Sequence, residues 1–208
     1  LDFPRGYHIE VGGGMTMPEY GIGFNPNEFN EFFGLRTGGY GNSLRDDVKK
    51  YYGSTIALMG RGEAIPLKEN YCEINPDTKD KYGVPVLKFR YKWSDHEYKQ
   101  AKHMHDTFEE IAYNMGGIPL GTKPTKKDNY GISVPGEIIH EVGTTRMGND
   151  PNNSVVNKYE RLHDVDNVYV VDAAPFVSQA DKNPTWTIMA LSMRTSEYII
   201  SELKKQNI

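Results

Sequence analysis

The sequence of 208 residues lacks the features that would mark three broad classes of protein. Its single cysteine, Cys72, excludes an internal disulfide and any zinc site built from several cysteines. Basic and acidic residues nearly balance, at 24 against 28, whereas a nucleic-acid-binding protein normally has a clear basic excess. No apolar run approaches the roughly 18 residues that cross a membrane. We therefore expect that the chain has no nucleic-acid partner and that it is not an integral membrane protein.

Two further signals are missing from the sequence. The chain opens at Leu1 without an initiator methionine or a signal sequence, so we interpret it as starting within a longer protein, as a mature form, a proteolytic product or a subcloned piece. Glycine is plentiful, but neither Gly12-Gly13-Gly14 nor the stretch 38–41 matches the G-x-G-x-x-G motif that dinucleotide binding needs. We interpret these glycines as turns between strands.

Residue periodicity predicts the elements of the first half of the chain. Residues 43–52 are predicted to form a short helix, and turn-forming residues stand at 75–77 and 82–83. After them, residues 87–93 alternate between apolar and basic side chains. That period of two predicts a strand of an antiparallel sheet with one buried face and one face in water.

The longest predicted helices follow in the second half. A capping box at Ser94–Glu97 opens a helix with an apolar stripe that ends at Gly116-Gly117. Residues 118–136 are predicted to be a loop, residues 168–171 a short buried strand, and residues 184–204 a long helix. Because strands and helices do not alternate in a βαβ rhythm, we predict an α+β fold, an antiparallel sheet flanked by helices, rather than a doubly wound sheet.

Two histidines of the first long helix superficially resemble a metal site. His103 and His105 are separated by one residue, so on a helix they point about 200° apart and cannot share one ion. We therefore predict no metal, and a metal-dependent hydrolase that uses this pair is the least favoured alternative.

The C-terminal seventy residues carry an ordered set of motifs. His140–Gly148 reads HEVGTTRMG and joins an ionisable ring to a turn of small residues. Asp172-Ala173 follows a short apolar run, and Asn183-Pro184-Thr185 opens the last predicted helix. Each has an ordinary structural explanation when taken alone, such as an asparagine N-cap before a proline at the first helical position. The specific signal is the order of these motifs along the chain and the spacing between them.

This ordered set resembles the C-terminal region of the glucose–methanol–choline (GMC) oxidoreductases, which are flavoenzymes that oxidise alcohols and sugars. The resemblance covers His140 to about Tyr198 and continues more weakly through Gly60–Glu63 and Asp80–Val86, which look like the family's substrate-domain strands. The His-x-x-Gly-Thr-x-Arg-Met-Gly and Asn-Pro-Thr forms look closest to the pyranose oxidase and gluconate dehydrogenase branches.

The resemblance implies roles for individual residues. His140 would lie over the flavin and take the proton of the substrate hydroxyl, and Asn183 would hydrogen-bond the same oxygen. Asp172 and Ala173 would contact the FAD chain, and Asn183-Pro184-Thr185 would lie against the pyrimidine edge of the flavin. The cofactor is then FAD and the substrate is a CH–OH group of a sugar or polyol, while the electron acceptor and the compartment stay open.

The resemblance also implies a domain organisation. Residues 1–139 would form the substrate-binding domain, and residues 140–208 would carry the active-site His and Asn with a strand and a helix that complete an FAD-binding domain lying mostly upstream of Leu1. We expect this piece alone to bind FAD poorly and to be inactive. The rival hypothesis is a non-catalytic binding or structural module on the same scaffold, since the dinucleotide fingerprint is missing.

Overall fold

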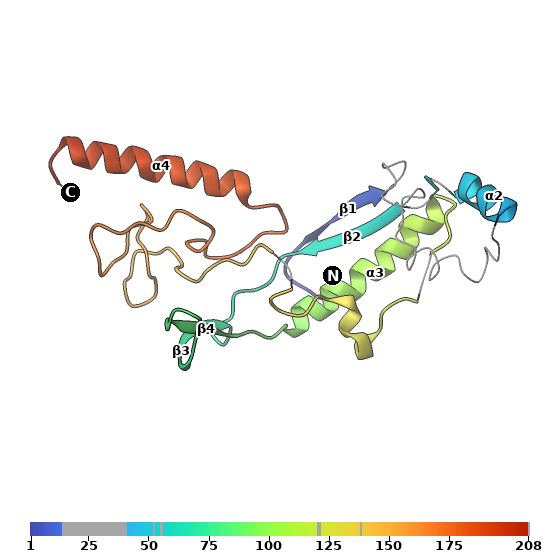
Figure 1. Cartoon of the computed structure of the whole chain (residues 1–208), viewed down its shortest axis with the longest axis horizontal. Helices are drawn as coiled ribbons and strands as arrows, with labels where there is room; N and C mark the ends of the chain where they lie inside the picture. Colours follow the sequence, from blue (N-terminus) through green and yellow to red (C-terminus); the bar gives the residue numbers. More distant parts are fainter. Residues whose placement is uncertain (14–40, 52, 55, 120–121, 138, 208) are drawn as a thin grey trace. The chain divides into compact units, whose positions relative to one another are not determined.

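The computed structural model describes residues 1–13, 41–51, 53–54, 56–119, 122–137 and 139–207. Its elements are β1 (Tyr7–Gly13), α2 (Asn42–Tyr51), β2 (Ile56–Gly62), β3 (Tyr71–Lys79), β4 (Pro85–Arg90), α3 (Asp95–Asn114), the 3-10 helix η1 (Lys126–Gly131) and α4 (Thr185–Lys204). In the described residues β1 pairs with β2 and β3 with β4, and both pairs run antiparallel (Figure 1). The predicted α+β class is confirmed. The prediction of a turn at Gly12 and Gly13 is wrong, because both belong to β1, while Gly14 and residues 38–40 lie outside the described residues.

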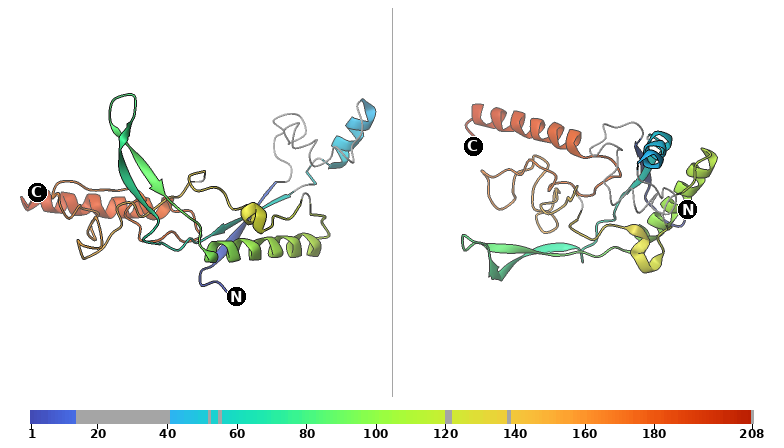
Figure 2. Two further views of the ribbon diagram at one scale, coloured as in Figure 1. Left: turned by 90° about the horizontal axis from the view of Figure 1, so that it is seen from below. Right: turned by 45° about the vertical axis from the view of Figure 1, so that its right-hand side comes forward.

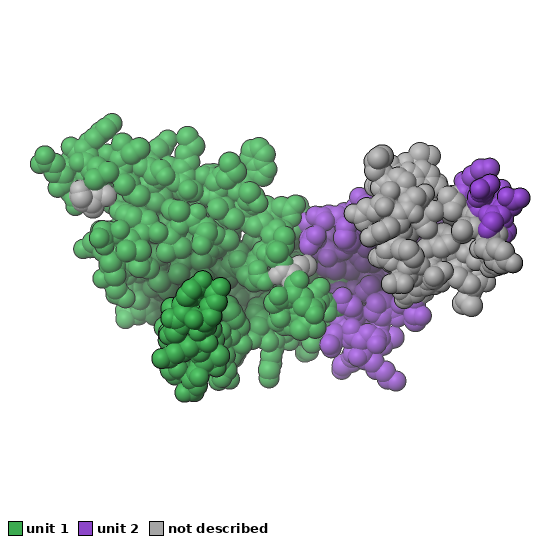
Figure 3. Space-filling view, in the orientation of Figure 1, with its two compact units in different colours: residues 1–6, 62–100, 132–208 green, residues 7–61, 101–131 purple. Residues whose placement is uncertain are grey.

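The chain divides into two compact units (Figure 3). Unit 1 consists of residues 1–6, 62–100 and 132–208, and unit 2 of residues 7–61 and 101–131. The predicted division between a substrate domain and an FAD-completing segment at residue 140 concerns binding of substrate and cofactor, and it stays a prediction.

In unit 2 the sheet formed by β1 and β2 packs against α3. The Tyr7 hydroxyl hydrogen-bonds His103 Nδ1 at 2.7 Å and Thr107 Oγ1 at 2.9 Å. On β2, Gly60 approaches α3 so closely that a Cβ there would overlap Met104 Sδ. Glycine at position 60 therefore permits close packing of strand on helix, and a larger residue would force the Met104 side chain to shift.

Helix α3 begins at the predicted capping box. Ser94 donates its backbone N–H to Glu97 Oε2 at 2.7 Å, and the His96 N–H donates to Ser94 Oγ at 3.2 Å. The helix ends before Gly116, whose φ of +74° is the left-handed conformation that glycine adopts without strain, and the predicted helix is confirmed. Helix α2 lies one residue from its predicted bounds at each end.

The Glu97 carboxyl is also held by a neighbouring segment of unit 1. Glu97 is 7% exposed and accepts the Ile65 backbone N–H at 3.0 Å as well as the Ser94 hydroxyl. Burial acts to raise the pKa of Glu97, but the hydrogen bonds from Ser94 and from backbone N–H groups offset this, and the pKa lies below its usual value.

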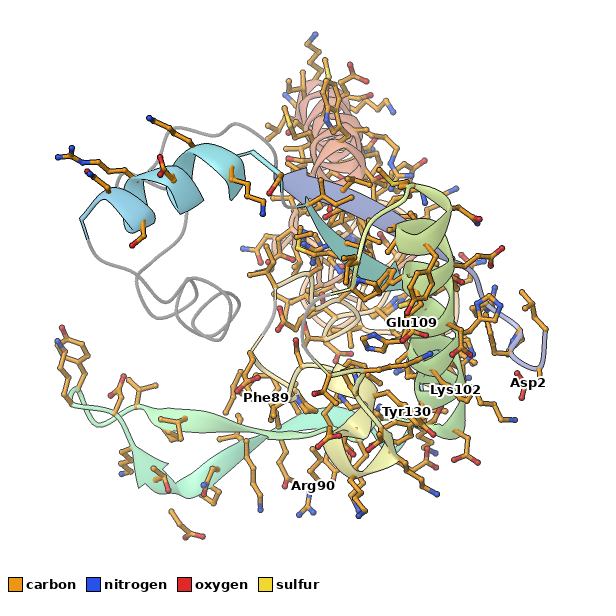
Figure 4. All side chains as sticks on the ribbon, turned by 90° about the vertical axis from the view of Figure 1, so that its right-hand side faces the viewer. Asp2, Phe89, Arg90, Lys102, Glu109 and Tyr130 are labelled. Carbon is orange, nitrogen blue, oxygen red and sulfur yellow. The ribbon has the colours of Figure 1, made fainter. Side chains whose placement is uncertain are left out.

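The β3–β4 ribbon (Figure 2) departs from the prediction in the burial of its side chains. Strand β4 ends at Arg90 rather than continuing through residue 93. The apolar face of the ribbon lies in water, with Ile74 of β3 68% exposed and Leu87 and Phe89 of β4 55% and 66% exposed. Figure 4 shows Phe89 and Arg90 on opposite sides of the ribbon, so the alternation is present. The prediction of a buried face is wrong because two strands alone cannot cover the side chains that they bring to one face.

The turn-forming residues around this ribbon have different outcomes. The predicted turn at residues 82–83 is confirmed, since Asp80 Oδ1 accepts the backbone N–H groups of Tyr82 at 2.8 Å and Val84 at 3.0 Å. Residues 75–77 instead belong to β3, where the pairing with β4 shifts register between Asn75 and Lys79. A bulge therefore accommodates residues that otherwise favour a turn.

Two predictions for the second half also need correction. Residues 168–171 form no strand: Tyr169 makes only an isolated bridge to Arg161, and Val168 and Val171 are 40% and 42% exposed. A strand needs a ladder of consecutive paired residues, and the described residues supply a single bridge to Tyr169. The predicted loop at 118–136 contains η1. Helix α4 is confirmed within one residue.

None of the helices among the described residues is both long and apolar enough to cross a membrane.

Candidate functional site

His140 stands in irregular backbone in unit 1 and has an unusual conformation. Its φ is +86°, a region that residues with a side chain rarely adopt, and its side chain is half-buried. Such backbone strain is maintained only where the surrounding structure enforces it, and it gathers at functional sites. Within the described residues the imidazole makes no hydrogen bond, so both ring nitrogens are available to a ligand.

The segment after His140 is fixed to the segment that carries Asp172 and Ala173. The N–H groups of Gly143 and Thr145 both donate to the Ala174 carbonyl, at 3.1 and 3.2 Å. Met147 N–H donates to the Pro175 carbonyl at 2.8 Å. Two motifs about thirty residues apart in the sequence are thus joined through their backbones.

Asp172 and Ala173 lie in a tight turn next to this pairing. Asp172 Oδ1 accepts the Ala174 backbone N–H at 2.7 Å, and the Ala173 carbonyl accepts the Phe176 N–H at 3.1 Å. Asp172 is exposed and Ala173 is half-buried. The second carboxylate oxygen of Asp172 therefore remains available as an acceptor.

Asn183-Pro184-Thr185 stands at the N-terminus of α4, as predicted. Pro184 is the N-cap residue, the Ile188 N–H donates to its carbonyl at 3.0 Å, and no side chain caps the helix. Asn183 and Thr185 are exposed. The ordinary explanation of Asn183 as a capping residue is therefore wrong, and its amide is free of hydrogen bonds to the described residues.

The structure does not join His140 and Asn183 directly. Both belong to unit 1, yet within the described part of the chain no hydrogen bond links their side chains. The backbone hydrogen bonds instead join residues 143–147, which follow His140, to Ala174 and Pro175, which follow Asp172 and Ala173.

The rest of the His140–Gly148 motif and the loop after it are held by local hydrogen bonds. Arg146 Nε donates to the Asn153 carbonyl at 2.7 Å. The Asp150 carboxylate accepts the Asn152 N–H at 3.0 Å and the Asn152 and Asn153 side-chain amides at 2.9 and 2.8 Å, and these bonds lower its pKa. The motif arginine therefore has a structural role in fixing this loop.

Sequence reasoning missed a buried polar pair that anchors α4. Glu160 and Thr195 are both fully buried, and the Thr195 hydroxyl lies 2.6 Å from Glu160 Oε2 and 3.2 Å from the Tyr159 carbonyl. Glu160 also has a positive φ of +62°. No local pattern marks a glutamate in a turn as buried.

His103 and His105 lie in unit 2 and have separate partners. His103 Nδ1 bonds the Tyr7 hydroxyl, and His105 Nε2 donates to the Tyr130 carbonyl at 2.9 Å. Figure 4 labels Lys102 and Glu109 on the same helix. No group of three metal-ligating side chains occurs among the described residues, and the two histidines do not converge.

Comparison with known proteins assigns the class to which this fold and these motifs belong. A family described as GMC oxidoreductase matches residues 66–192, which is more than half of the chain. The chain belongs to the GMC oxidoreductase family.

Several curated relatives are similar to this chain. It is 31% identical to the 2-methyl-1,2-propanediol dehydrogenase of Mycolicibacterium austroafricanum over 77% of this chain and 28% of the relative. It is 27% identical to the gluconate 2-dehydrogenase flavoprotein of Pantoea cypripedii, over 81% of this chain and 28% of the relative. It is 30% identical to the pyranose 2-oxidase of Lyophyllum shimeji, over 72% of this chain and 23% of the relative. The predicted likeness to pyranose oxidases and gluconate dehydrogenases is confirmed, and the chain spans less than a third of the length of these relatives.

Proposed function

We propose that this chain is the C-terminal, substrate-side portion of an FAD-dependent GMC oxidoreductase that oxidises a CH–OH group of a sugar or polyol, with His140 as the base. Family membership supports the reaction class, and the names of the relatives describe enzymes for a diol, a sugar acid and a pyranose. The observation that carries the proposal is the strained backbone of His140, in a segment hydrogen-bonded to Ala174 beside Asp172 and Ala173.

Two side chains of this chain would act on the substrate hydroxyl. His140 takes the hydroxyl proton as the C–H bond breaks, because a neutral imidazole has a ring nitrogen whose lone pair accepts a proton. The Asn183 amide donates a hydrogen bond to the same oxygen and holds the alkoxide that develops. Bound FAD would supply the acceptor for the hydride that leaves the substrate carbon. Neither side chain is engaged by the described residues, which suits a group that must meet substrate.

The residues present fit part of a flavin site. Asp172 and Ala173 would contact the FAD chain, and Asn183, Pro184 and Thr185 the pyrimidine edge. The N–H groups of the first turn of α4 have no side-chain cap, so the positive end of the helix dipole is free to face negative charge on the flavin.

The remainder of the cofactor site would come from an FAD domain outside these 208 residues, since the chain has no G-x-G-x-x-G motif. One apolar face of α4 is exposed, with Trp186 85%, Met189 63% and Met193 66% accessible. These residues recur at three- and four-residue spacing and so form one stripe. We infer that this stripe packs against that domain.

The absorption spectrum of the protein expressed from its own gene tests the proposal. We expect an absorption band of oxidised flavin. Under anaerobic conditions this band should bleach when a neutral sugar or polyol is added. A protein with flavin that no compound of a broad sugar and polyol panel reduces would contradict the substrate class. Protein purified without flavin, and unable to take up added FAD, would favour a non-catalytic module instead.

A further inference from the structure

A hydrogen-bonded trio of ionisable side chains lies on the β1–β2 sheet of unit 2. His8 Nε2 donates to Glu10 Oε1 at 3.2 Å, and Arg61 Nε donates to Glu10 Oε2 at 3.1 Å. Among the described residues each carboxylate oxygen therefore has one partner, and it can accept a second hydrogen bond. None of these residues belongs to the motifs assigned to the flavin and the hydroxyl proton.

The trio occupies the face of the β1–β2 sheet opposite the one that packs against α3. Tyr7 hydrogen-bonds α3, and a Cβ at Gly60 would point into α3. Because successive residues of a strand point to opposite faces, His8 after Tyr7 and Arg61 after Gly60 lie on the other face. Glu10, two residues after His8, shares that face.

The trio is partly shielded yet accessible. The exposed fractions of the side chains are 22% for His8, 29% for Glu10 and 31% for Arg61. Within the described part of the chain, the Nη groups of Arg61 have no hydrogen-bond partner. Carboxylate acceptors and guanidinium donors therefore stand side by side, and two neighbouring hydroxyl groups, which both donate and accept, complement that arrangement.

The charges of the trio select against charged ligands. Hydrogen bonds from His8 and from Arg61 hold the pKa of Glu10 below its usual value, so its carboxyl is ionised at neutral pH. An anionic ligand that contacts both residues is attracted by Arg61 and repelled by Glu10, and for a cationic ligand the signs are reversed, so neither gains a net attraction that offsets the loss of its hydration. A neutral ligand does not lose the hydration of a charge.

We propose that Glu10 and Arg61 bind a neutral 1,2-diol group of a sugar or polyol and discriminate against sugars that carry a charge, with His8 positioning the Glu10 carboxylate. This inference rests on the proposed function, because it takes a sugar or polyol as the ligand. It adds that this ligand is uncharged. It concerns the β1–β2 face of unit 2 alone.

Three pyranoses of matched ring size test the charge preference. The affinities of D-glucose, D-glucuronate and D-glucosamine are measured by titration calorimetry on the protein expressed from its own gene, which requires no turnover. We expect glucose to bind at least about fivefold more tightly than either charged sugar. Glu10→Gln should weaken glucose binding about tenfold and shift the remaining preference toward glucuronate. Arg61→Met should weaken glucose binding similarly and shift the preference toward glucosamine.

Asp106→Asn is the matched control. Asp106 lies in the same unit and is also an ion-paired carboxylate, with Lys102 and Lys123 as partners, but it is on α3. This variant should leave all three affinities unchanged. The ratio of the affinities of one variant for two sugars does not depend on the fraction of that variant that is folded. The preference among the three sugars can therefore be measured even for a destabilised variant.

Three results would overturn the inference: no binding of any probe by the unaltered protein, glucose affinity unchanged in both variants, or the same order of the three sugars in every protein. The trio would then be a cross-strand ion pair of structural importance only. Failure of the proposed function is visible separately, as a missing flavin band or a band that no substrate bleaches, whatever the charge preference.

Discussion

Gly143 and Ala174 lie side by side, with the Gly143 N–H donating to the Ala174 carbonyl at 3.1 Å. This bond joins the segment that follows His140 to the turn that contains Asp172 and Ala173. A residue proposed to meet substrate and residues proposed to meet cofactor are thereby held in one unit. The arrangement supplies the fixed geometry that a proton transfer coupled to hydride removal requires.

The first prediction concerns the two side chains proposed to act on substrate. His140→Ala should slow flavin reduction by substrate by about 100-fold or more in stopped-flow measurements, while FAD stays bound, because the base is lost. Asn183→Ala should also slow reduction, since the alkoxide loses a donor. Asn149→Ala, an exposed asparagine of the same unit, should have no effect. Normal reduction kinetics in either site variant would remove that residue from the mechanism.

The second prediction concerns the close approach of β2 to α3. Gly60→Ala should lower the free energy of unfolding by about 1–3 kcal/mol, since the new methyl group overlaps Met104 Sδ and lies 3.2 Å from Phe108 Cζ. Gly6→Ala is the control, because a Cβ there meets no atom within 4 Å. Urea unfolding at neutral pH measures both. Equal stability of the two variants would show that the packing at position 60 is looser than the structure indicates.

The third prediction concerns pH. The pKa of Glu97 is lower in the folded protein than in the unfolded chain, so its contribution to stability is present above the unfolded value of about 4.3 and is lost as pH falls through the folded pKa. Glu97→Gln should cost about 1 kcal/mol at pH 7, with the difference from the unaltered protein shrinking at pH 3. Glu110→Gln, an exposed residue of α3, should change little at either pH. A penalty for Glu97→Gln that is the same at both pH values would contradict this account.

The fourth prediction concerns the anchor of α4. Thr195→Val keeps the shape of the side chain but removes the hydroxyl bonded to the buried Glu160, so it should cost about 1–3 kcal/mol in thermal or urea unfolding. Thr195→Ser keeps the hydroxyl and should cost less. If valine proved as stable as threonine at this position, the hydrogen bond would not stabilise the docking of α4.

Local signals predicted the helices well. The capping box at Ser94 and Glu97 and the glycine at 116 defined α3 because caps and stops act through hydrogen bonds between residues close in the sequence. The alternation at residues 87–89 was also predicted from local sequence, because successive side chains of a strand point to opposite faces. Whether that apolar face is covered depends on residues far away, and here Leu87 and Phe89 are exposed.

The candidate site divides in the same way. The sequence named His140, Asp172, Ala173 and Asn183 through the order of their motifs. It did not reveal that His140 has a positive φ or that the Asn183 amide leaves α4 uncapped. These features depend on how separate segments pack against each other.

The sequence by itself determined the family, the α+β class and the bounds of the long helices, because these follow from motif order and from interactions within a few residues. Only the tertiary structure decided that residues 143–147 pair with Ala174 and Pro175, that residues 168–171 form no strand, and that Glu160 is buried against Thr195. Each of these depends on contacts between segments distant in the sequence, where no local pattern specifies the partner.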